Sequence, residues 1–121
     1  MPSMQWTESQ YQAYLRRQEE QARPRRDGSM SEAALLEHIR ALARQYRWLV
    51  YHTHDSRGSE AGFPDLCMVN GRRLVFWETK TQRGRVTIPQ AQWLERLSRV
   101  QLVEARVVRP ADVEDIPGWL R

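Results

Sequence analysis

The sequence predicts an α/β domain, because segments with a helical spacing of apolar residues alternate with short runs that are typical of strands. Residues 31–47 repeat apolar side chains at three- and four-residue steps. Residues 65–80 contain two strand-like runs around Asn70-Gly71, and residues 87–110 contain a capped helical segment followed by an alternating strand. The predicted order of elements is therefore helix, strand, strand, strand, helix, strand.

The first helix of the domain is predicted at residues 31–47, where the apolar residues draw a single stripe. A helix with one apolar stripe buries that face against a core. Residues 48–52 (WLVYH) are aromatic and β-branched and predict a strand, and the polar residues 53–62 predict a loop after it. The stripe of the helix consists of Leu35, Leu36, Ile39, Leu42, Ala43 and Tyr46.

A β-hairpin is predicted next. Phe63-Pro64 favours an extended backbone before residues 65–69 (DLCMV), because proline restricts the residue that precedes it. Asn-Gly is the strongest short signal for a two-residue hairpin turn, and Asn70-Gly71 is followed by residues 73–80 (RLVFWETK). Two antiparallel strands are therefore expected on either side of Asn70-Gly71.

The C-terminal third is predicted to be a helix and a strand. Thr87 is a candidate N-cap for a helix that continues to about Arg99, with Pro89 in its first turn. Residues 101–110 alternate apolar and polar side chains and predict the strand. Residues 111–121 form an acidic closing segment that contains proline and predicts no clear element.

An N-terminal extension is expected to precede the domain. Residues 5–22 carry helix formers behind a possible N-cap at Thr7 or Ser9 and predict a short helix. Residues 23–28 contain proline, two arginines and Asp-Gly, a composition typical of a linker. The predicted division is an extension with its linker at 1–28 and one main domain at 29–121.

Composition narrows the class of protein. A chain of 121 residues with 40% hydrophobic and 28% charged residues suits one globular domain. The longest apolar run, residues 74–77, is far too short for a membrane span, and the single Cys67 excludes an internal disulfide. The N-terminus lacks the pattern of an export signal, so we expect a reducing cytoplasm. A net charge of +4 and a pI near 9.8 make nucleic acid a plausible partner.

Lys80 is the only lysine among 19 basic residues, and two acids are expected beside it. Alternate residues of a strand share a face, so Glu78 and Lys80 project to the same side with α-carbons about 7 Å apart. Asp65 opens the neighbouring strand of the same hairpin and should lie beside Glu78. Two close carboxylates repel unless a cation lies between them, and hard oxygen ligands favour Mg²⁺ or Mn²⁺. The backbone carbonyl of Thr79 offers a third oxygen.

Lysine has a role at such a site that arginine cannot fill. A compact ammonium can shift its pKa towards neutrality and orient or activate a water molecule, whereas a guanidinium stays protonated. Simpler interpretations remain open. Glu78 and Lys80 can instead be solvated residues at the end of a strand that contribute little to stability, and Asp65 can be a turn or cap residue.

Pro64-Asp65 followed by Glu78-Thr79-Lys80 resembles the PD-(D/E)xK nuclease signature. Further matches are SE at 31–32, GFPDL at 62–66, GR at 84–85 and Gln90, and with them residues 31 to about 116 resemble the virus-type replication-repair nuclease (VRR-NUC) family. The resemblance implies a restriction-endonuclease-like core, with a mixed central sheet flanked by helices, and divalent-metal-dependent phosphodiester hydrolysis. It also implies a homodimer that acts on branched DNA in a bacterial or phage-infected cell.

The resemblance assigns roles by position. It makes Asp65 and Glu78 the metal ligands, Lys80 the catalytic lysine, Glu32 the acid of the first helix and Gln90 the final motif residue. Glu32 lies three and four residues before members of the apolar stripe, so we expect it to face inward in a supporting or second-metal role. Gln90 could hydrogen-bond a water molecule or Lys80, or be a solvated residue of a first helical turn.

Glu32 also has a structural alternative. Ser29 and Glu32 have the spacing of a capping box, and an acid in a first turn interacts favourably with the helix dipole.

Contacts with phosphate are expected from basic side chains near the signature. His54 and Arg57 lie on the loop that precedes Asp65, and Arg83 and Arg85 follow the strand that carries Lys80. Solvated surface arginine is the alternative for each of them. His52 and His54 alternate on one face, but no further nitrogen or sulfur ligand lies nearby, which favours structural or phosphate-contacting roles over a metal pair.

The leading hypothesis is a homodimeric, Mg²⁺-dependent endonuclease for branched or recombination-type DNA. A restriction-type endonuclease that cuts linear duplex is the alternative enzyme. A catalytically silent nucleic-acid-binding module is the alternative from another class, although a protein that only binds phosphate gains nothing from several acids at its ligand. An unrelated α/β domain with a chance motif is the fourth possibility.

Overall fold

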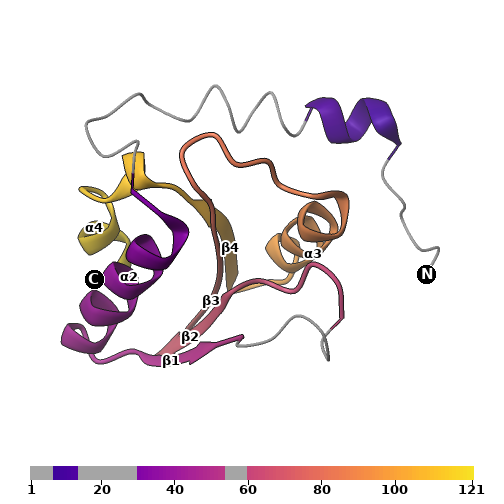
Figure 1. The fold of residues 1–121 in the computed structure, drawn as a ribbon. Coiled ribbons are helices and arrows are strands. Elements are labelled where there is room, and N and C mark those ends of the chain that lie inside the picture. The colour runs from indigo at the N-terminus through magenta and orange to yellow at the C-terminus, as the bar shows by residue number, and fades with distance from the viewer. Residues whose placement is uncertain (1–6, 14–29, 54–59) are drawn as a thin grey trace.

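The computed structural model describes residues 7–13, 30–53 and 60–121. A central sheet separates the helices into two layers (Figure 1). α2 (Glu32–Gln45) and the short α4 (Ile116–Leu120) lie on one face of the sheet, and α3 (Ile88–Ser98) lies on the other. The α/β class and the predicted order of helices and strands are confirmed.

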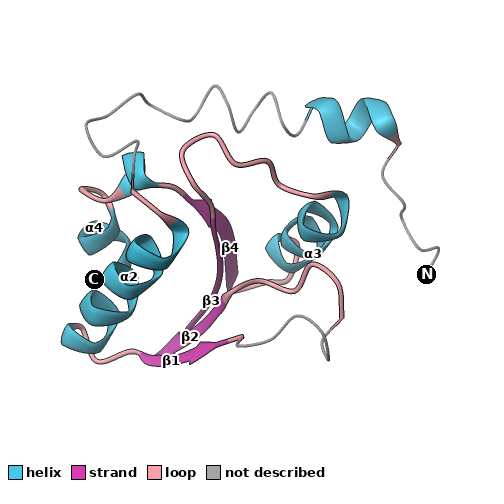
Figure 2. Cartoon of the chain, viewed as in Figure 1, coloured by secondary structure: helices cyan, strands magenta, loops and turns pink. Residues whose placement is uncertain are grey.

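The sheet has four strands in the order β1-β2-β3-β4 (Figure 2). β1 (Leu49–His52), β2 (Leu66–Asn70) and β3 (Arg73–Thr79) pair antiparallel, whereas β4 (Val103–Val108) pairs parallel with β3. A parallel neighbour needs a crossover connection, and α3 provides it. The sheet is therefore mixed, as the family resemblance implied.

The hairpin between β2 and β3 differs from the prediction by one residue. Asn70 pairs with Arg73, so the two turn residues are Gly71 and Arg72, and Gly71 has a φ of +58°. Asn70 instead remains in β2 and donates from its side chain to the carbonyl of Tyr46 at 3.3 Å. The antiparallel pairing itself is as predicted, with Leu66 opposite Trp77.

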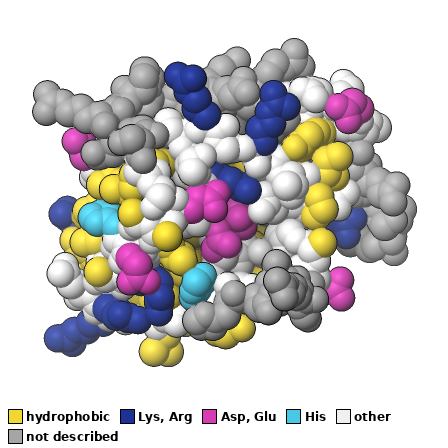
Figure 3. Space-filling model, in the orientation of Figure 1, with side chains coloured by type: hydrophobic (Ala, Val, Ile, Leu, Met, Phe, Trp, Pro, Cys, Tyr) yellow, Lys and Arg dark blue, Asp and Glu magenta, His cyan; other side chains and the backbone are white. Residues whose placement is uncertain are grey.

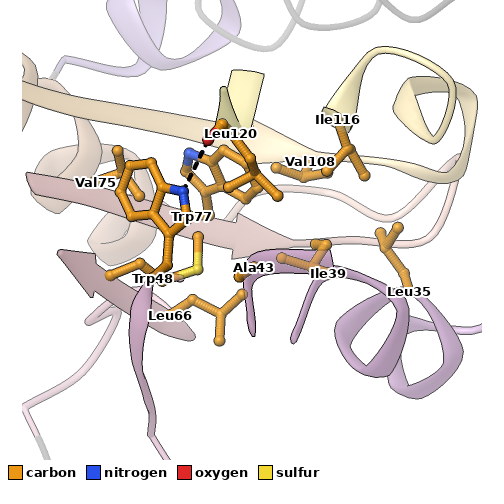
Figure 4. Packing of buried hydrophobic residues seen from close by; sticks show 11 residues of the cluster. Leu35, Ile39, Ala43, Trp48, Leu66, Val75, Trp77, Val108, Ile116 and Leu120 are labelled. Atoms are coloured by element: carbon orange, nitrogen blue, oxygen red, sulfur yellow. Dashed lines mark hydrogen bonds between the residues drawn. The ribbon is translucent and has the colours of Figure 1, made fainter. Parts of the chain in front are cut away.

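The larger hydrophobic core lies between the sheet and the layer formed by α2 and α4 (Figure 4). Leu35, Ile39 and Ala43 from the predicted stripe of α2 are fully buried there. The closing segment, for which the sequence predicted no element, forms a 3-10 turn (Pro110–Asp112) and α4. Its Leu120 is buried and accepts a hydrogen bond from the indole of Trp48 at 2.9 Å.

A smaller apolar cluster lies on the α3 side of the sheet. It consists of Val86 and Ala91, with Tyr11 and Val107 packed against them. Residues 8–13 are helical, and the hydroxyl of Tyr11 donates to the carbonyl of Val86. This short N-terminal helix therefore packs on the domain.

The N-terminal helix begins behind one of its two predicted caps, whereas the cap of α2 differs from the predicted pair. Thr7 caps residues 8–13, since its side chain accepts from the amide of Gln10 at 3.2 Å. Ser31 caps α2 by accepting from the amide of Ala34 at 3.1 Å. The expected capping box of Ser29 with Glu32 is wrong, because Glu32 is the first residue of the helix and not the third. Ser29 and the predicted linker 23–28 lie outside the described residues.

Within the described ranges, no helix is both long enough and apolar enough to span a membrane.

Candidate active site

Asp65 and Glu78 converge at the end of the hairpin that is distant from its turn. Leu66 pairs with Trp77, so one residue further along the ladder Asp65 lies across from Glu78. Thr79 fixes the aspartate, because its backbone amide at 2.9 Å and its hydroxyl at 2.8 Å both donate to Oδ2 of Asp65. The predicted juxtaposition of the two acids is therefore present.

Glu78 is buried, with 3% of its surface exposed. Gln90 donates to its Oε1 at 3.1 Å, whereas its Oε2 is buried and has no hydrogen-bond partner in the described part of the chain. The pKa of Glu78 is raised from 4.5 to about 9, mainly by burial and secondly by the negative charge and close approach of the Asp65 carboxylate. The alternative in which Glu78 is a solvated residue of a frayed strand is wrong.

Lys80 completes the site from the residue after β3. Its amide donates to the carbonyl of Val108 at 3.0 Å, which continues the ladder with β4. Its side chain is half-buried, and its positive charge lowers the pKa of Glu78, so the ammonium acts on the same carboxyl group as Asp65. Figure 3 shows acidic side chains gathered near the centre of one face, with a basic side chain beside them.

Gln90 links α3 to the acids. Thr87 and Gln90 form a capping box, in which Oε1 of Gln90 accepts from the amide of Thr87 at 2.9 Å. The amide group of the side chain is thereby oriented so that its nitrogen points at Glu78. Within the described residues, the contact of Gln90 in the site is with Glu78, and a hydrogen bond to a water molecule or to Lys80 stays a prediction.

The loop before Asp65 is held against the start of α3, a contact that sequence reasoning missed. Gly62 has a φ of +86°, and a β-carbon there would lie 2.4 Å from the backbone carbon of Pro89. Trp93 donates from its indole to the carbonyl of Ala61 at 3.1 Å and packs edge-on against Phe63, with ring centroids 5.1 Å apart. The one sequence feature that could have indicated this close contact is Gly62, directly before Phe63-Pro64-Asp65.

The residues present fit a divalent cation. An oxygen of Glu78 is buried without a hydrogen-bond partner among the described residues, and Asp65 lies close to the same carboxyl group. The backbone carbonyl of Thr79, at the end of β3 between Glu78 and Lys80, is a third candidate oxygen. No group of three or more His, Cys, Asp or Glu within 7–13, 30–53 and 60–121 could hold a metal. The candidate ligands are two carboxylates and a carbonyl, and Mg²⁺ commonly retains water or phosphate oxygens as its remaining ligands.

Glu32 is not where the sequence placed it. The expectation that it faces inward is wrong, because the side chain is exposed in the first turn of α2. The inward stripe begins at Leu35, since the helix starts at Glu32 and presents its first turn to solvent. A supporting role for Glu32 stays a prediction.

The expected phosphate contacts are described only in part. Arg83 and Arg85 are exposed on the loop between β3 and α3, and His52 is half-buried on β1. His54 and Arg57 lie outside the described residues. Figure 3 shows further basic side chains on the same face as the acidic group.

Comparison with known families agrees with this geometry. A family model described as the VRR-NUC domain matches residues 5–110, so the match begins within the segment predicted as an N-terminal extension. No curated protein and no solved structure matches the chain significantly. The boundary at residues 28–29 stays a prediction. Since the match covers nearly the whole chain, the protein belongs to the VRR-NUC family and is a nuclease of the PD-(D/E)xK type.

Proposed function

We propose that the protein is a divalent-metal-dependent endonuclease that acts as a homodimer on branched DNA. The observation that carries the metal dependence is the buried Oε2 of Glu78, which has no hydrogen-bond partner in the described chain although a second carboxylate adjoins it. A cation between the two groups removes their repulsion and gives the buried oxygen a partner.

The roles of the residues follow from their placement. Asp65, Glu78 and the carbonyl of Thr79 would hold Mg²⁺ or Mn²⁺, with Thr79 also fixing Asp65 through its amide and hydroxyl. Such an ion, when bound, stabilises charge on the scissile phosphate and acidifies a coordinated water. Gln90 fixes the rotamer of Glu78 through the hydrogen bond to Oε1.

Lys80 orients the attacking water. Its stem leaves β3 beside Glu78, which places a compact ammonium next to the two acids. A guanidinium at this position would be larger and would form a bidentate pair with a carboxylate, which would occupy the oxygens that the cation needs. Arg83, Arg85, His54 and Arg57 are proposed to contact phosphates, and Glu32 to support the site from α2.

Cleavage of a substrate panel tests the proposal. Linear, flapped and four-way DNA are incubated with Mg²⁺, with Mn²⁺ and with excess chelator. We expect cleavage of the branched substrates only, in both metals and not with chelator. Asp65→Ala and Lys80→Ala are each expected to reduce the rate by at least about a hundredfold, while circular dichroism and DNA affinity change little.

Each outcome decides something. Cleavage of plain duplex at a rate equal to that of the junction indicates the restriction-type alternative. DNA binding without cleavage in either metal indicates a catalytically silent module. Wild-type rates in either variant contradict the assigned roles. Sedimentation of the protein near its working concentration tests the homodimer, for which the support is the family resemblance, and a monomer that still cuts contradicts it.

A further inference from the structure

A buried arginine organises the turn that follows Lys80. Arg109, directly after β4, is 8% exposed. Its Nη1 donates to the carbonyls of Thr81 at 2.7 Å, Gly84 at 2.8 Å and Gln82 at 3.3 Å. One guanidinium therefore gathers three carbonyls of the turn at residues 81–84.

A side chain of the turn also bonds the segment that follows Arg109. Oε1 of Gln82 accepts from the backbone amide of Ala111 at 2.9 Å. Arg109 is itself fixed by Asp112, whose Oδ2 accepts from its amide at 2.8 Å and whose amide donates to its carbonyl at 2.8 Å. The turn at 81–84 and the 3-10 turn at 110–112 therefore form one hydrogen-bonded unit.

This unit lies close to the side chain of Lys80. A β-carbon placed on Gly84 would lie 2.8 Å from Oγ1 of Thr81 and 3.6 Å from Cδ of Lys80. Gly84 thus lies near the lysine stem, which a side chain at this position would touch. Because the amide of Lys80 is bonded to Val108, the residue before Arg109, both the backbone and the stem of Lys80 are set from the end of β4.

Arginine is suited to this position because its guanidinium stays charged when buried and carries several donors in a fixed plane. Removing it would take away the donor to the carbonyl of Gly84 and leave the carbonyl of Thr81 bonded to the amide of Gly84, in a partly buried turn, which favours a rearranged backbone. A rearranged turn would change the space that is open to the stem of Lys80.

We propose that Arg109 is a positioning residue for Lys80, acting by holding the turn at 81–84 against the lysine side chain. The proposal rests on the proposed role of Lys80 in orienting water. It assigns no contact between Arg109 and DNA.

The single lysine makes the proposal directly measurable. Incorporation of ¹³C,¹⁵N-lysine into the full chain labels Lys80 alone, so one Cε signal reports on its surroundings. We expect Arg109→Gln to shift this signal and to sharpen it towards that of a mobile side chain, and Arg109→Lys to produce a smaller change. Arg99→Gln is the matched control, because Arg99 is paired on the surface with Glu95, and it should leave the signal in place.

Cleavage kinetics provide the second readout. At saturating DNA, Arg109→Gln is expected to lower the cleavage rate at least about tenfold while DNA affinity changes by less than about threefold, since a small misplacement of a catalytic group has large kinetic effects. Gln82→Ala, which removes only the bond to Ala111, should change the lysine signal and the rate in the same direction but less.

An unchanged Lys80 signal in folded Arg109→Gln overturns the proposal. If Arg109→Gln does not fold, Gln82→Ala decides: an altered Lys80 signal supports the proposal and an unaltered one overturns it. A loss of DNA affinity equal to the loss of rate, with an unchanged lysine signal, also overturns it. The lysine spectrum does not depend on nuclease activity, so failure of the proposed endonuclease function would be seen separately as a wild-type protein that does not cut.

Discussion

Glu78 is buried, and its Oε2 has no hydrogen-bond partner among the described residues. Its protonation state should therefore depend on whether a cation is bound beside it. Its pKa is raised to about 9, first by burial and then by Asp65. Without a cation the carboxyl group is therefore protonated at neutral pH. The proposed cation would bind the ionised form, so its binding should release a proton.

The pKa of Glu78 predicts how the metal-free protein responds to pH. The folded-state pKa of about 9 lies above the ordinary value of 4.5, so the folded state holds its proton where the unfolded state has lost it. The stabilisation is complete below pH 4.5 and is lost as pH rises towards about 9. The free energy of unfolding should fall by up to about 1.4 kcal/mol per pH unit from this group.

Urea unfolding in chelator between about pH 5 and 8.5 measures this slope. Glu78→Gln keeps the shape of the side chain without the titration, and it should flatten the slope. Identical slopes in the two proteins would show that the carboxyl group does not titrate as described.

Thr79 offers a second test at the scale of one residue. Its hydroxyl donates to Asp65, so Thr79→Val removes one of two donors and leaves the backbone amide in place. Loss of a group that orients a ligand typically costs about 10–100-fold in metal affinity. Calorimetric titration with Mn²⁺ should show a loss of this order, and Thr79→Ser, which retains the hydroxyl, should restore most of it. Equal affinities for valine and serine would contradict the role of the hydroxyl.

At the scale of elements, the N-terminus of α3 is where the loop before β2 and the acids of the hairpin meet. The capping box orients Gln90 towards Glu78, and Gly62 brings the preceding loop against Pro89. Trp93, one turn further along the helix, bonds the same loop at Ala61. The distance between α3 and this loop is thus set by the backbone contact of Gly62 with Pro89, which leaves no room for a side chain at position 62.

Gly62→Ala should therefore separate the loop from α3. Its β-carbon would lie 2.4 Å from Pro89, and the φ of +86° adds backbone strain. We expect destabilisation of more than about 2 kcal/mol and a lower cleavage rate, because the loop leads directly into Asp65.

Gly71→Ala is the matched control. Gly71 also has a positive φ, of +58°, but a β-carbon there would meet nothing within 4 Å. It should cost only about 1–2 kcal/mol of backbone strain and leave the cleavage rate unchanged. Thermal unfolding and single-turnover cleavage of both variants measure the difference, and equal effects would contradict the importance of the contact with Pro89.

At the scale of the whole molecule, the larger core and the carboxyl group of Glu78 lie on opposite faces of the sheet. Trp77, next to Glu78, is buried in the core with Ile39 of α2, whereas Glu78 is bonded to Gln90 of α3 on the other face. The core also includes Leu120 from the last helix, tied to Trp48. Stability and chemistry should therefore be separable by mutation.

Ile39→Val tests this separation. Removal of one buried methylene should lower the free energy of unfolding by about 0.5–1.5 kcal/mol, as is typical for this change. The cleavage rate at a temperature well below the midpoint of unfolding should match that of the wild type, since Ile39 lies on the far face from Glu78. Denaturant unfolding and single-turnover cleavage measure both, and a rate that falls with stability would show that the two faces are coupled.

The sequence by itself determined α2, α3 and the four strands, and the meeting of Asp65, Glu78 and Lys80. Periodicity marks α2 and α3, and the short turn after Asn70 brings the two strands into register to within one residue. That register places Asp65 opposite Glu78, with Lys80 two residues further on. These features were predictable because they depend on residues close together in the chain and on the fixed geometry of a hairpin.

Only the tertiary structure decided how the site is supported. The bond from Gln90 to Glu78, the contact of Gly62 with Pro89, and the carbonyls gathered by Arg109 each join segments whose packing no local pattern specifies. Packing between distant elements also decided that α4 contributes to the core and that Glu32 is exposed to solvent. Local periodicity determines which face of an element is apolar, but the partner of a buried polar group is determined only when distant elements pack.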